Sequence, residues 1–268
     1  MNIIKATDLS PKGAQLSLIL GPPGIGKSTF AASVINVVPK DEILLVATLP
    51  REVKSWKYQE YDFDTILIEE SDKWDPLNKS YQPTAFRETI KLLDELAEDE
   101  KYGAVIIDNG TEVSEFAWHD SLAPLKIGDP NELGSGGNRF APYTSIRERM
   151  ENFIMKVNRL TNSSASARAK HVIIPWHVQP PKDDEGKQKD IEYAGKELPM
   201  IRGGFRRRIG QKIDVIAYMT RKTTQGGKKV EYKLQIVSDM DKHCKVPCQV
   251  PDGVKFIDPE YEKLLDLI

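Results

Sequence analysis

The sequence contains very few cysteines, and this scarcity excludes one class of fold. Cys244 and Cys248 are the only two in 268 residues, so no disulfide framework is expected and a reducing compartment is favoured. His243 stands beside them at a spacing that a metal site could use, but no second cluster accompanies it. We therefore interpret the two cysteines as incidental thiols.

Long apolar runs are also missing. No stretch of about 18 apolar residues occurs, so we expect no helical membrane span and no membrane partner. The first residues, Met1–Asp8, lack the pattern of a signal peptide. These two absences predict a cytoplasmic protein.

Net charge is the third thing that the chain lacks. It carries 38 basic and 40 acidic residues, a net charge of −2 at pH 7. No global field attracts DNA or an anionic surface, so any contact with a polyanion must be local. The length of 268 residues fits one α/β domain with insertions, and we predict a single domain over residues 1–268.

What the sequence does have is a phosphate-binding motif near its start. The pattern G-x-x-x-x-G-K-[ST] lies between an apolar run that predicts a strand, Leu16–Leu20, and a helical segment at residues 28–38. The predicted nucleotide-binding residues are Gly21, Pro22, Pro23, Gly24, Ile25, Gly26, Lys27, Ser28 and Thr29. Backbone N–H groups of such a loop point at phosphates, Lys27 would reach the β- and γ-phosphates, and Ser28 would hold Mg²⁺. The motif predicts a protein that binds ATP with Mg²⁺.

Apolar segments alternate with helical patterns along the rest of the chain. Helices are expected from Pro83, as first helical residue, to Glu98 and at residues 144–160, each with one apolar stripe. Further short buried strands are expected at residues 43–47, 65–68, 104–108, 172–175 and 213–218. This alternation predicts an α/β fold with a mostly parallel sheet flanked by helices.

The end of the chain has a different pattern. Residues 230–236 alternate between apolar and polar and follow a glycine-containing turn at 225–228, which predicts an antiparallel hairpin. A short closing helix is expected at residues 258–268. Two long polar stretches, 121–142 and 179–208, interrupt the core pattern, and loops of this length are usually functional or disordered.

Acidic residues at predicted strand ends are candidates for catalysis. Asp108 ends an apolar strand, where an aspartate of a phosphate-loop ATPase binds the Mg²⁺ hydration shell and the loop hydroxyl. Hydrolysis also needs a carboxylate that orients or deprotonates water. Three positions remain open for that role: Glu52, Glu112, and Glu69 or Glu70.

Basic residues supply two further candidates. His177 follows the strand at 172–175, where it could sense the γ-phosphate. The segment 201–212 carries five basic residues and no acid. Arginines among glycines suit contact with a phosphate backbone, or with the nucleotide of a neighbouring subunit. The candidate DNA-binding residues are Arg202, Arg206, Arg207 and Arg208.

The order of these motifs resembles the RecA-like P-loop ATPases of bacteriophages, a group of phage nucleotide-binding proteins related to single-strand-annealing recombinases. The resemblance extends over about residues 14–240 and rests on four segments: residues 21–29, 102–108, 173–177, and 198–200 followed by 213–218. It implies a RecA-like domain that hydrolyses ATP, assembles as a homo-oligomer and acts in the host cytoplasm.

The same resemblance assigns roles to individual residues. The catalytic glutamate of the family corresponds to Glu52, and its polar sensor to His177 or Gln179. Loops that contact single-stranded DNA correspond to the two long polar stretches. The chain departs from the family at Asn109, where serine is usual, and at residues 48–52, which differ from the family's acidic turn.

These observations lead to one main hypothesis and two alternatives. The main one is a Mg-ATP-dependent ATPase acting on single-stranded DNA in phage recombination or replication. A nucleotide-regulated interaction protein with little hydrolysis is the first alternative. A small-molecule kinase, with Arg206–Arg208 imitating a lid, is the second. Phosphate release stimulated by DNA would separate the first hypothesis from the others.

Overall fold

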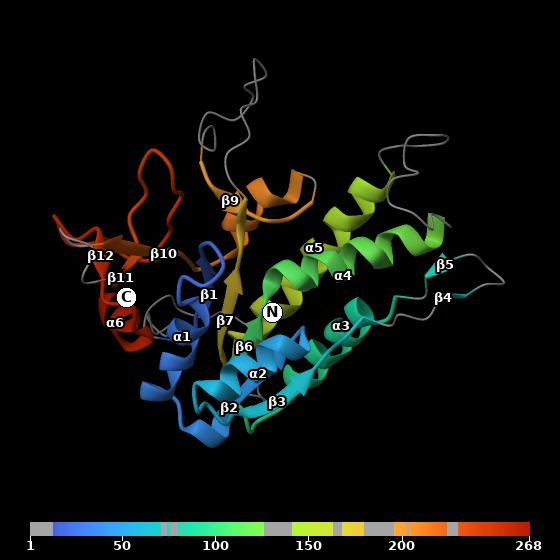
Figure 1. The fold of residues 1–268 in the computed structure, drawn as a ribbon, viewed down its shortest axis with the longest axis horizontal. Coiled ribbons are helices and arrows are strands. Elements are labelled where there is room, and N and C mark those ends of the chain that lie inside the picture. The colour runs from blue at the N-terminus through green and yellow to red at the C-terminus, as the bar shows by residue number, and fades with distance from the viewer. Residues whose placement is uncertain are drawn as a thin grey trace, which may run out of the picture.

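The fold is built around one large sheet (Figure 1). In this computed structural model eight strands form it, in the order β12-β11-β10-β1-β7-β6-β2-β3. The described residues are 13–70, 74–75, 80–81, 83–125, 141–162, 168–179, 196–202, 204–223 and 230–268.

Six neighbouring strands of this sheet run parallel. They are β1 (Leu16–Leu20), β2 (Ile43–Ala47), β3 (Asp64–Leu67), β6 (Ala104–Asp108), β7 (His171–Trp176) and β10 (Val215–Thr223). The antiparallel strands β11 (Val230–Gln235) and β12 (Phe256–Ile257) extend it beyond β10. Two small ribbons pair β4 (Trp74–Asp75) with β5 (Ser80–Tyr81) and β8 (Val178–Gln179) with β9 (Leu198–Pro199).

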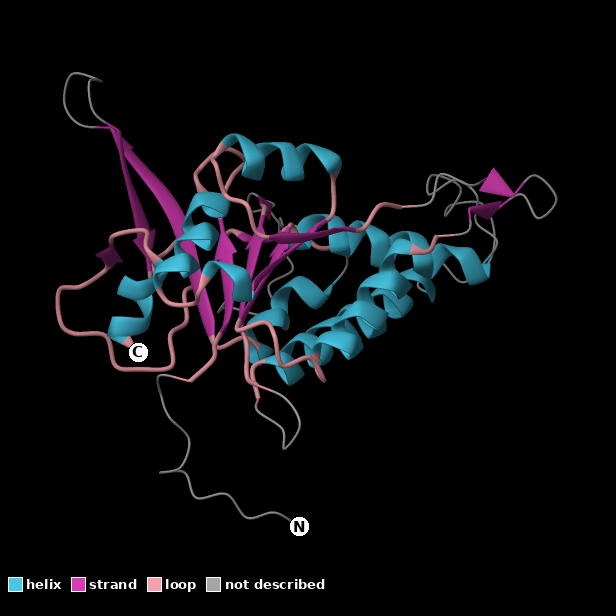
Figure 2. Ribbon diagram, turned by 90° about the horizontal axis from the view of Figure 1, so that it is seen from below, coloured by secondary structure: helices cyan, strands magenta, loops and turns pink. Residues whose placement is uncertain are grey.

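Helices lie on both sides of the sheet (Figure 2). They are α1 (Lys27–Ala32), α2 (Pro50–Tyr58), α3 (Ala85–Leu96), α4 (Gly110–Leu122), α5 (Ala141–Leu160) and α6 (Tyr261–Leu267). Short 3₁₀ turns occupy Ser33–Asn36, Lys40–Glu42, Ala123–Leu125, Gly204–Arg207 and Ile209–Lys212. Helices α3, α4 and α5 bury their apolar residues against one face, whereas Phe30 of α1 and Tyr261 of α6 pack together on the other. Among the described residues, no helix is long and apolar enough to cross a bilayer.

The predicted fold class is confirmed by this topology, including the C-terminal antiparallel hairpin. Strands β1, β2 and β6 are apolar apart from Ser17 and Asp108, and they are buried along their whole length between two helical layers. The prediction of a buried strand near residue 65 is wrong in one respect. All four residues of β3 are exposed, because β3 forms the edge of the sheet.

Helix boundaries differ from the predicted ones for local reasons. The helix after the phosphate loop ends at Ala32, where the Ser33 hydroxyl donates to the carbonyl of Phe30, and a 3₁₀ turn follows. Pro83 is not the first helical residue. Helix α3 begins at Ala85, because the Glu70 carboxylate accepts hydrogen bonds from the backbone N–H groups of Thr84 and Ala85.

The two long polar stretches are only partly described. The first begins inside α4 and ends inside α5, and residues 126–140 lie outside the described part of the chain. Of the second, residues 180–195 lie outside it, as do residues 225–228 of the predicted hairpin turn. The expectation that these loops are functional therefore remains a prediction.

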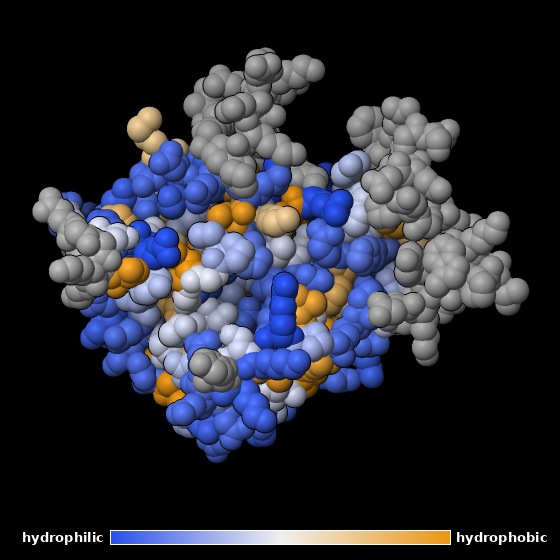
Figure 3. All heavy atoms as spheres, in the orientation of Figure 1, coloured by the Kyte–Doolittle hydropathy of each residue, from blue (hydrophilic) through white to orange (hydrophobic). Residues whose placement is uncertain are grey.

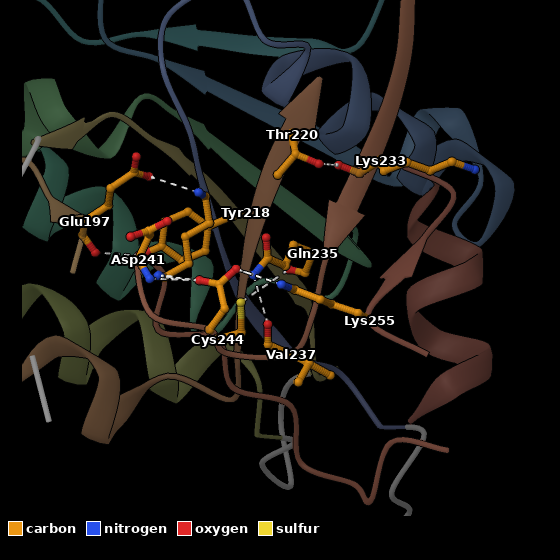
Figure 4. Close-up of polar contacts among 11 residues, drawn as sticks. Glu197, Tyr218, Thr220, Lys233, Gln235, Val237, Asp241, Cys244 and Lys255 are labelled. Carbon is orange, nitrogen blue, oxygen red and sulfur yellow. Dashed lines mark hydrogen bonds and ion pairs between the residues drawn. The ribbon is translucent and has the colours of Figure 1, made fainter. Parts of the chain in front are cut away.

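The chain that follows residue 195 is tied to the C-terminal strands (Figure 4). The Tyr218 hydroxyl donates to the carbonyl of Glu197 at 2.7 Å, and the Glu197 N–H donates to the carbonyl of Asp241 at 2.7 Å. Nearby, the Cys244 thiol donates to the carbonyl of Gln235, and burial raises the pKa of that thiol to about 12. The second thiol, Cys248, donates to the carbonyl of Leu267. Both cysteines are free.

Candidate nucleotide-binding site

The carboxyl ends of four parallel strands meet at one edge of the sheet. Strands β1, β2, β6 and β7 end there at Leu20, Ala47, Asp108 and Trp176. A cleft of about 550 Å³ opens at this edge, between the phosphate loop and α2. Its lining residues are Pro23, Gly24, Gly26, Lys27, Ser28, Thr29, Arg51, Glu52, Ser55, Gln59, Asp108, Asn109 and His177. Most of the predicted nucleotide-binding residues are therefore in the cleft.

The phosphate loop depends on two glycines for its shape. Gly24 has φ +72° and Gly26 has φ +91°, a left-handed conformation that residues with a side chain rarely adopt. The three motif residues outside the lining support the loop: Ile25 is buried in the core, and Gly21 donates its N–H to the carbonyl of Trp176. Pro22 supplies a carbonyl that holds the motif lysine.

Lys27 places its ammonium group at the mouth of the loop. The Nζ atom donates to the carbonyls of Gly21 at 2.9 Å and Pro22 at 2.8 Å. It also lies 3.1 Å from Nδ1 of His177, which must accept this hydrogen bond because an ammonium group only donates. Burial lowers the pKa of Lys27 to about 8, although the charge of Asp108 opposes this shift.

Asp108 and Ser28 form the candidate metal site. The Ser28 hydroxyl donates to Oδ2 of Asp108 at 2.8 Å, and the indole N–H of Trp56 donates to the same oxygen at 2.8 Å. Burial raises the pKa of Asp108, while these two hydrogen bonds and the charge of Lys27 lower it.

This pair of oxygen ligands suits Mg²⁺, which protein sites hold with one or two carboxylates and substrate phosphates. The described residues contain no group of three or more His, Cys, Asp or Glu side chains able to hold a metal ion. Mg²⁺ would thus depend on phosphate oxygens and water for its remaining ligands.

Glu52 lies in the first turn of α2 with its carboxylate in the cleft. Its Oε2 atom accepts hydrogen bonds from the N–H groups of Thr48 at 3.0 Å and Leu49 at 2.9 Å, and its Oε1 atom accepts one from the Asn109 amide. Burial, followed by the charge of Asp108, raises the pKa of Glu52 to about 7 against the hydrogen bonds from Thr48 and Leu49. A carboxylate with such a pKa is suited to exchange protons at neutral pH.

The other candidate glutamates lie elsewhere. Glu112 is in the first turn of α4 and does not line the cleft. Glu70 caps α3, as described above, and lies 3.5 Å from His119. Glu69 is exposed after the edge strand. Of the candidate glutamates, Glu52 is therefore the one that lines the cleft.

We expect Glu52→Gln to lower ATP turnover by about 100-fold, because a positioned base contributes roughly that much or more. Nucleotide affinity should change little, since the amide oxygen can still accept the N–H groups of Thr48 and Leu49. Glu112→Gln, an equal change outside the cleft, should keep the normal rate. Steady-state phosphate release measures the turnover rates of the two variants. Normal rates in both variants would show that neither Glu52 nor Glu112 is the base.

His177 lies where the sequence predicted it, at the end of β7. Its backbone N–H donates to the Thr111 hydroxyl at 2.9 Å, and its ring contacts Lys27. Burial and then the charge of Lys27 lower its pKa, so the ring is neutral at pH 7. A neutral ring in contact with the motif lysine can register a phosphate that draws the ammonium away.

Gly110 allows α4 to start close to β7. A Cβ atom at this position would lie 2.1 Å from the ring of Trp176, which is fully buried. We expect Gly110→Ala to destabilise the fold by about 1–3 kcal/mol in urea unfolding, because the tryptophan must move. Ser114→Ala is the matched control in the same helix, since its buried hydroxyl has no hydrogen-bond partner among the described residues. Equal stability of the two variants would contradict the predicted clash.

Three of the four candidate arginines have described side chains, and these lie outside the lining of the cleft. The Arg202 guanidinium pairs with Glu115 at 3.1 Å and lies over the ring of Trp118. Arg206 donates to Oε1 of Gln179 at 3.0 Å, and Arg208 is exposed. The side chain of Arg207 lies outside the described part of the chain. None of these three side chains is among the residues that line the cleft.

Helix α2 supplies the site residues that the sequence reading missed. Arg51 and Ser55 line the cleft, as does Gln59 just after the helix, and Trp56 binds Asp108 from the buried side. Two local signals could have revealed this helix. Proline occupies its first position and glutamate its third, where the side chain accepts the N-terminal N–H groups.

One known protein family matches most of the chain. The AAA domain family matches the chain over residues 14–246. No curated protein matches it.

Several solved structures are similar to the chain at low identity. An ATPase from the type III secretion system of pathogenic bacteria is 14% identical, with a TM-score of 0.45 over 78% of this chain and 51% of that one. A KaiC-like protein from Pyrococcus horikoshii OT3 is 10% identical, with a TM-score of 0.45 over 87% of this chain and 84% of that one. The RadB recombinase is 11% identical, with a TM-score of 0.37 over 82% of this chain and 88% of that one. The chain thus spans about half the length of the secretion ATPase.

Proposed function

This chain belongs to the AAA domain family, and on that premise we propose that it is a Mg²⁺-dependent ATPase that acts on single-stranded DNA. One observation carries the ATPase part of the proposal. The motif residues Lys27 and Ser28, the strand-end acid Asp108 and the glutamate Glu52 line one cleft, although they come from separate parts of the sequence.

Each residue has a role that its position supports. The loop and Lys27 would bind the phosphates of ATP, and Ser28 with Asp108 would hold Mg²⁺, which neutralises charge on the reacting phosphate. Glu52 would accept the proton of the attacking water, as its raised pKa allows. The neutral ring of His177 accepts a hydrogen bond from Lys27, so it would sense a movement of the Lys27 ammonium group toward a bound phosphate.

The DNA part of the proposal rests on the link between the cleft and the basic segment. The carbonyl of His177 accepts the N–H of Met200 at 2.8 Å, and Gln179, two residues further on, accepts a hydrogen bond from Arg206. A change at the γ-phosphate could therefore reach the arginines. The face shown in Figure 3 is mostly hydrophilic with scattered apolar residues, which suits a polar partner better than an apolar one. The phage recombination or replication role and the homo-oligomer follow the resemblance described above.

ATP turnover with and without single-stranded DNA tests this proposal. Turnover should rise with DNA in the wild type. Replacing Arg206, Arg207 and Arg208 with alanine should flatten the log–log salt dependence of DNA binding by up to roughly two units. Unchanged DNA affinity and salt slope would exclude the cluster as a DNA site. A loss of turnover that depends on protein concentration would instead place these arginines at a subunit interface.

A nucleotide switch with little hydrolysis is the second candidate, and one observation favours it. Both carboxylate oxygens of Glu52 already accept hydrogen bonds, from Thr48 and Leu49 on one side and Asn109 on the other. The hydrogen bonds from Thr48 and Leu49 stabilise the charged carboxylate, so they weaken Glu52 as a base and oppose the effect of burial. Tight ATP binding without turnover, with or without DNA, would select the switch.

A further inference from the structure

Arg51 is a cation in the cleft that no part of the proposed mechanism uses. It is the second residue of α2, next to Glu52, and it lines the cleft together with Lys27 and His177. Pro50 fixes the start of the helix, and the bonded carboxylate of Glu52 fixes its first turn. The backbone that presents the Arg51 side chain is therefore held on both sides.

The guanidinium of Arg51 has no hydrogen bond or ion pair with any other described residue. This distinguishes it from Arg202, which pairs with Glu115, and from Arg206, which binds Gln179. Its charge nevertheless reaches the site: after burial and Lys27, Arg51 also lowers the pKa of His177. Arg51 is thus an exposed cation at the cleft without a hydrogen bond or ion pair among the described residues, although its charge also lowers the pKa of Glu112 against the larger effect of burial, which raises it.

We propose that Arg51 binds the γ-phosphate of ATP within its own chain, from the side of the cleft that α2 forms. This inference rests on the proposed nucleotide site. A planar guanidinium matches the oxygens of a terminal phosphate in a two-point contact, and it stabilises charge that develops there during transfer. The residue would thereby distinguish ATP from ADP, and would supply positive charge without a neighbouring subunit.

The first test compares two ligands, ADP and the non-hydrolysable analogue adenylyl imidodiphosphate, by titration calorimetry. Arg51→Ala should lower the affinity for the analogue at least about tenfold, because the analogue has a γ-phosphate. The affinity for ADP, which has none, should stay within about twofold of the wild-type value. Arg51→Lys should lie between Arg51→Ala and the wild type. Lys54→Ala removes an exposed cation of the same helix outside the cleft and should change neither affinity.

The second test asks whether Arg51 acts within its own chain. Turnover of Arg51→Ala should fall about 100-fold. Mixing it with Lys27→Ala should restore no activity, because every intact arginine then lies in a chain without the motif lysine.

Several outcomes would overturn the inference. An equal loss of affinity for ADP and for the analogue in Arg51→Ala would show that Arg51 does not contact the γ-phosphate in particular. Unchanged affinities for both would show that Arg51 does not contact the nucleotide. Recovered turnover in the mixture would show that Arg51 serves a neighbouring subunit. A wild-type protein that binds neither ligand would overturn the proposed function itself. If the wild type and Arg51→Ala bind ATP equally well, only the inference about Arg51 fails.

Discussion

Lys27→Ala is expected to lower the affinity for ATP at least about tenfold, because the contact between a buried ammonium and phosphate is worth roughly 1.5–3 kcal/mol. The Nζ atom is aimed at the mouth of the loop by the carbonyls of Gly21 and Pro22. Among the described residues that line the cleft, the other lysine or arginine is Arg51, which reaches the cleft from α2 and not from the loop. Calorimetric titration with ATP measures the loss, and Lys57→Ala, an exposed lysine of α2, is the control.

The same variant should remain folded, for a reason that the pKa of Lys27 provides. That pKa is lowered from 10.5 to about 8 in the folded chain, so burial disfavours the charged form there. Charged Lys27 therefore costs stability below pH 8, and this cost disappears as pH rises through the interval from about 8 to 10.5. Wild type should gain thermal stability relative to Lys27→Ala over that interval. Unchanged ATP affinity in a folded variant would overturn the nucleotide site.

The central strands could be predicted because burial on both faces leaves a simple pattern. Strand β6, between β2 and β7, consists of apolar residues up to Asp108, and the run ends where the strand ends. The order of strands within the sheet determines which strands are exposed to water and which strands are buried. That order depends on contacts between distant residues, so the exposure of β3 at the edge could not be seen in its own four residues.

Helices α2 and α4 could not be identified by an apolar stripe. Helix α2 has only nine residues, most of them polar, and its buried anchor is Trp56. Helix α4 is buried on most sides, including Ser114 and Asp120, so its apolar residues do not form a single stripe. Such helices are set by their tertiary surroundings.

The candidate site, too, has a part that the sequence predicts and a part that depends on contacts between distant residues. The phosphate loop is a local motif whose strand, turn and helix are contiguous, so residues 21–29 could be identified from the sequence. The partners of that loop come from other strand ends and from α2. The contact from Trp56 to Asp108 joins residues 52 positions apart, and no local pattern encodes it. The role of Arg51 was missed for the same reason.

Asp108→Asn should reduce Mg²⁺-dependent turnover by about 100-fold to 1000-fold while ATP still binds. The amide oxygen can take the place of Oδ2 and keep the hydrogen bonds from Ser28 and Trp56, so the cleft should retain its shape. What disappears is the negative charge that favours a divalent cation beside the phosphates. Turnover is measured across a Mg²⁺ titration, with binding of ATP followed separately by calorimetry.

Two further variants separate charge from shape in this prediction. Asp108→Ala leaves the indole N–H of Trp56 buried without a partner, so it should also lower the melting temperature, whereas Asp108→Asn should not. Asp64→Asn makes the same chemical change at the opposite end of the parallel strands and should leave turnover unaffected. Normal turnover in Asp108→Asn at low Mg²⁺ would show that Asp108 only ends its strand. A loss that high Mg²⁺ partly repairs would assign its charge to the metal.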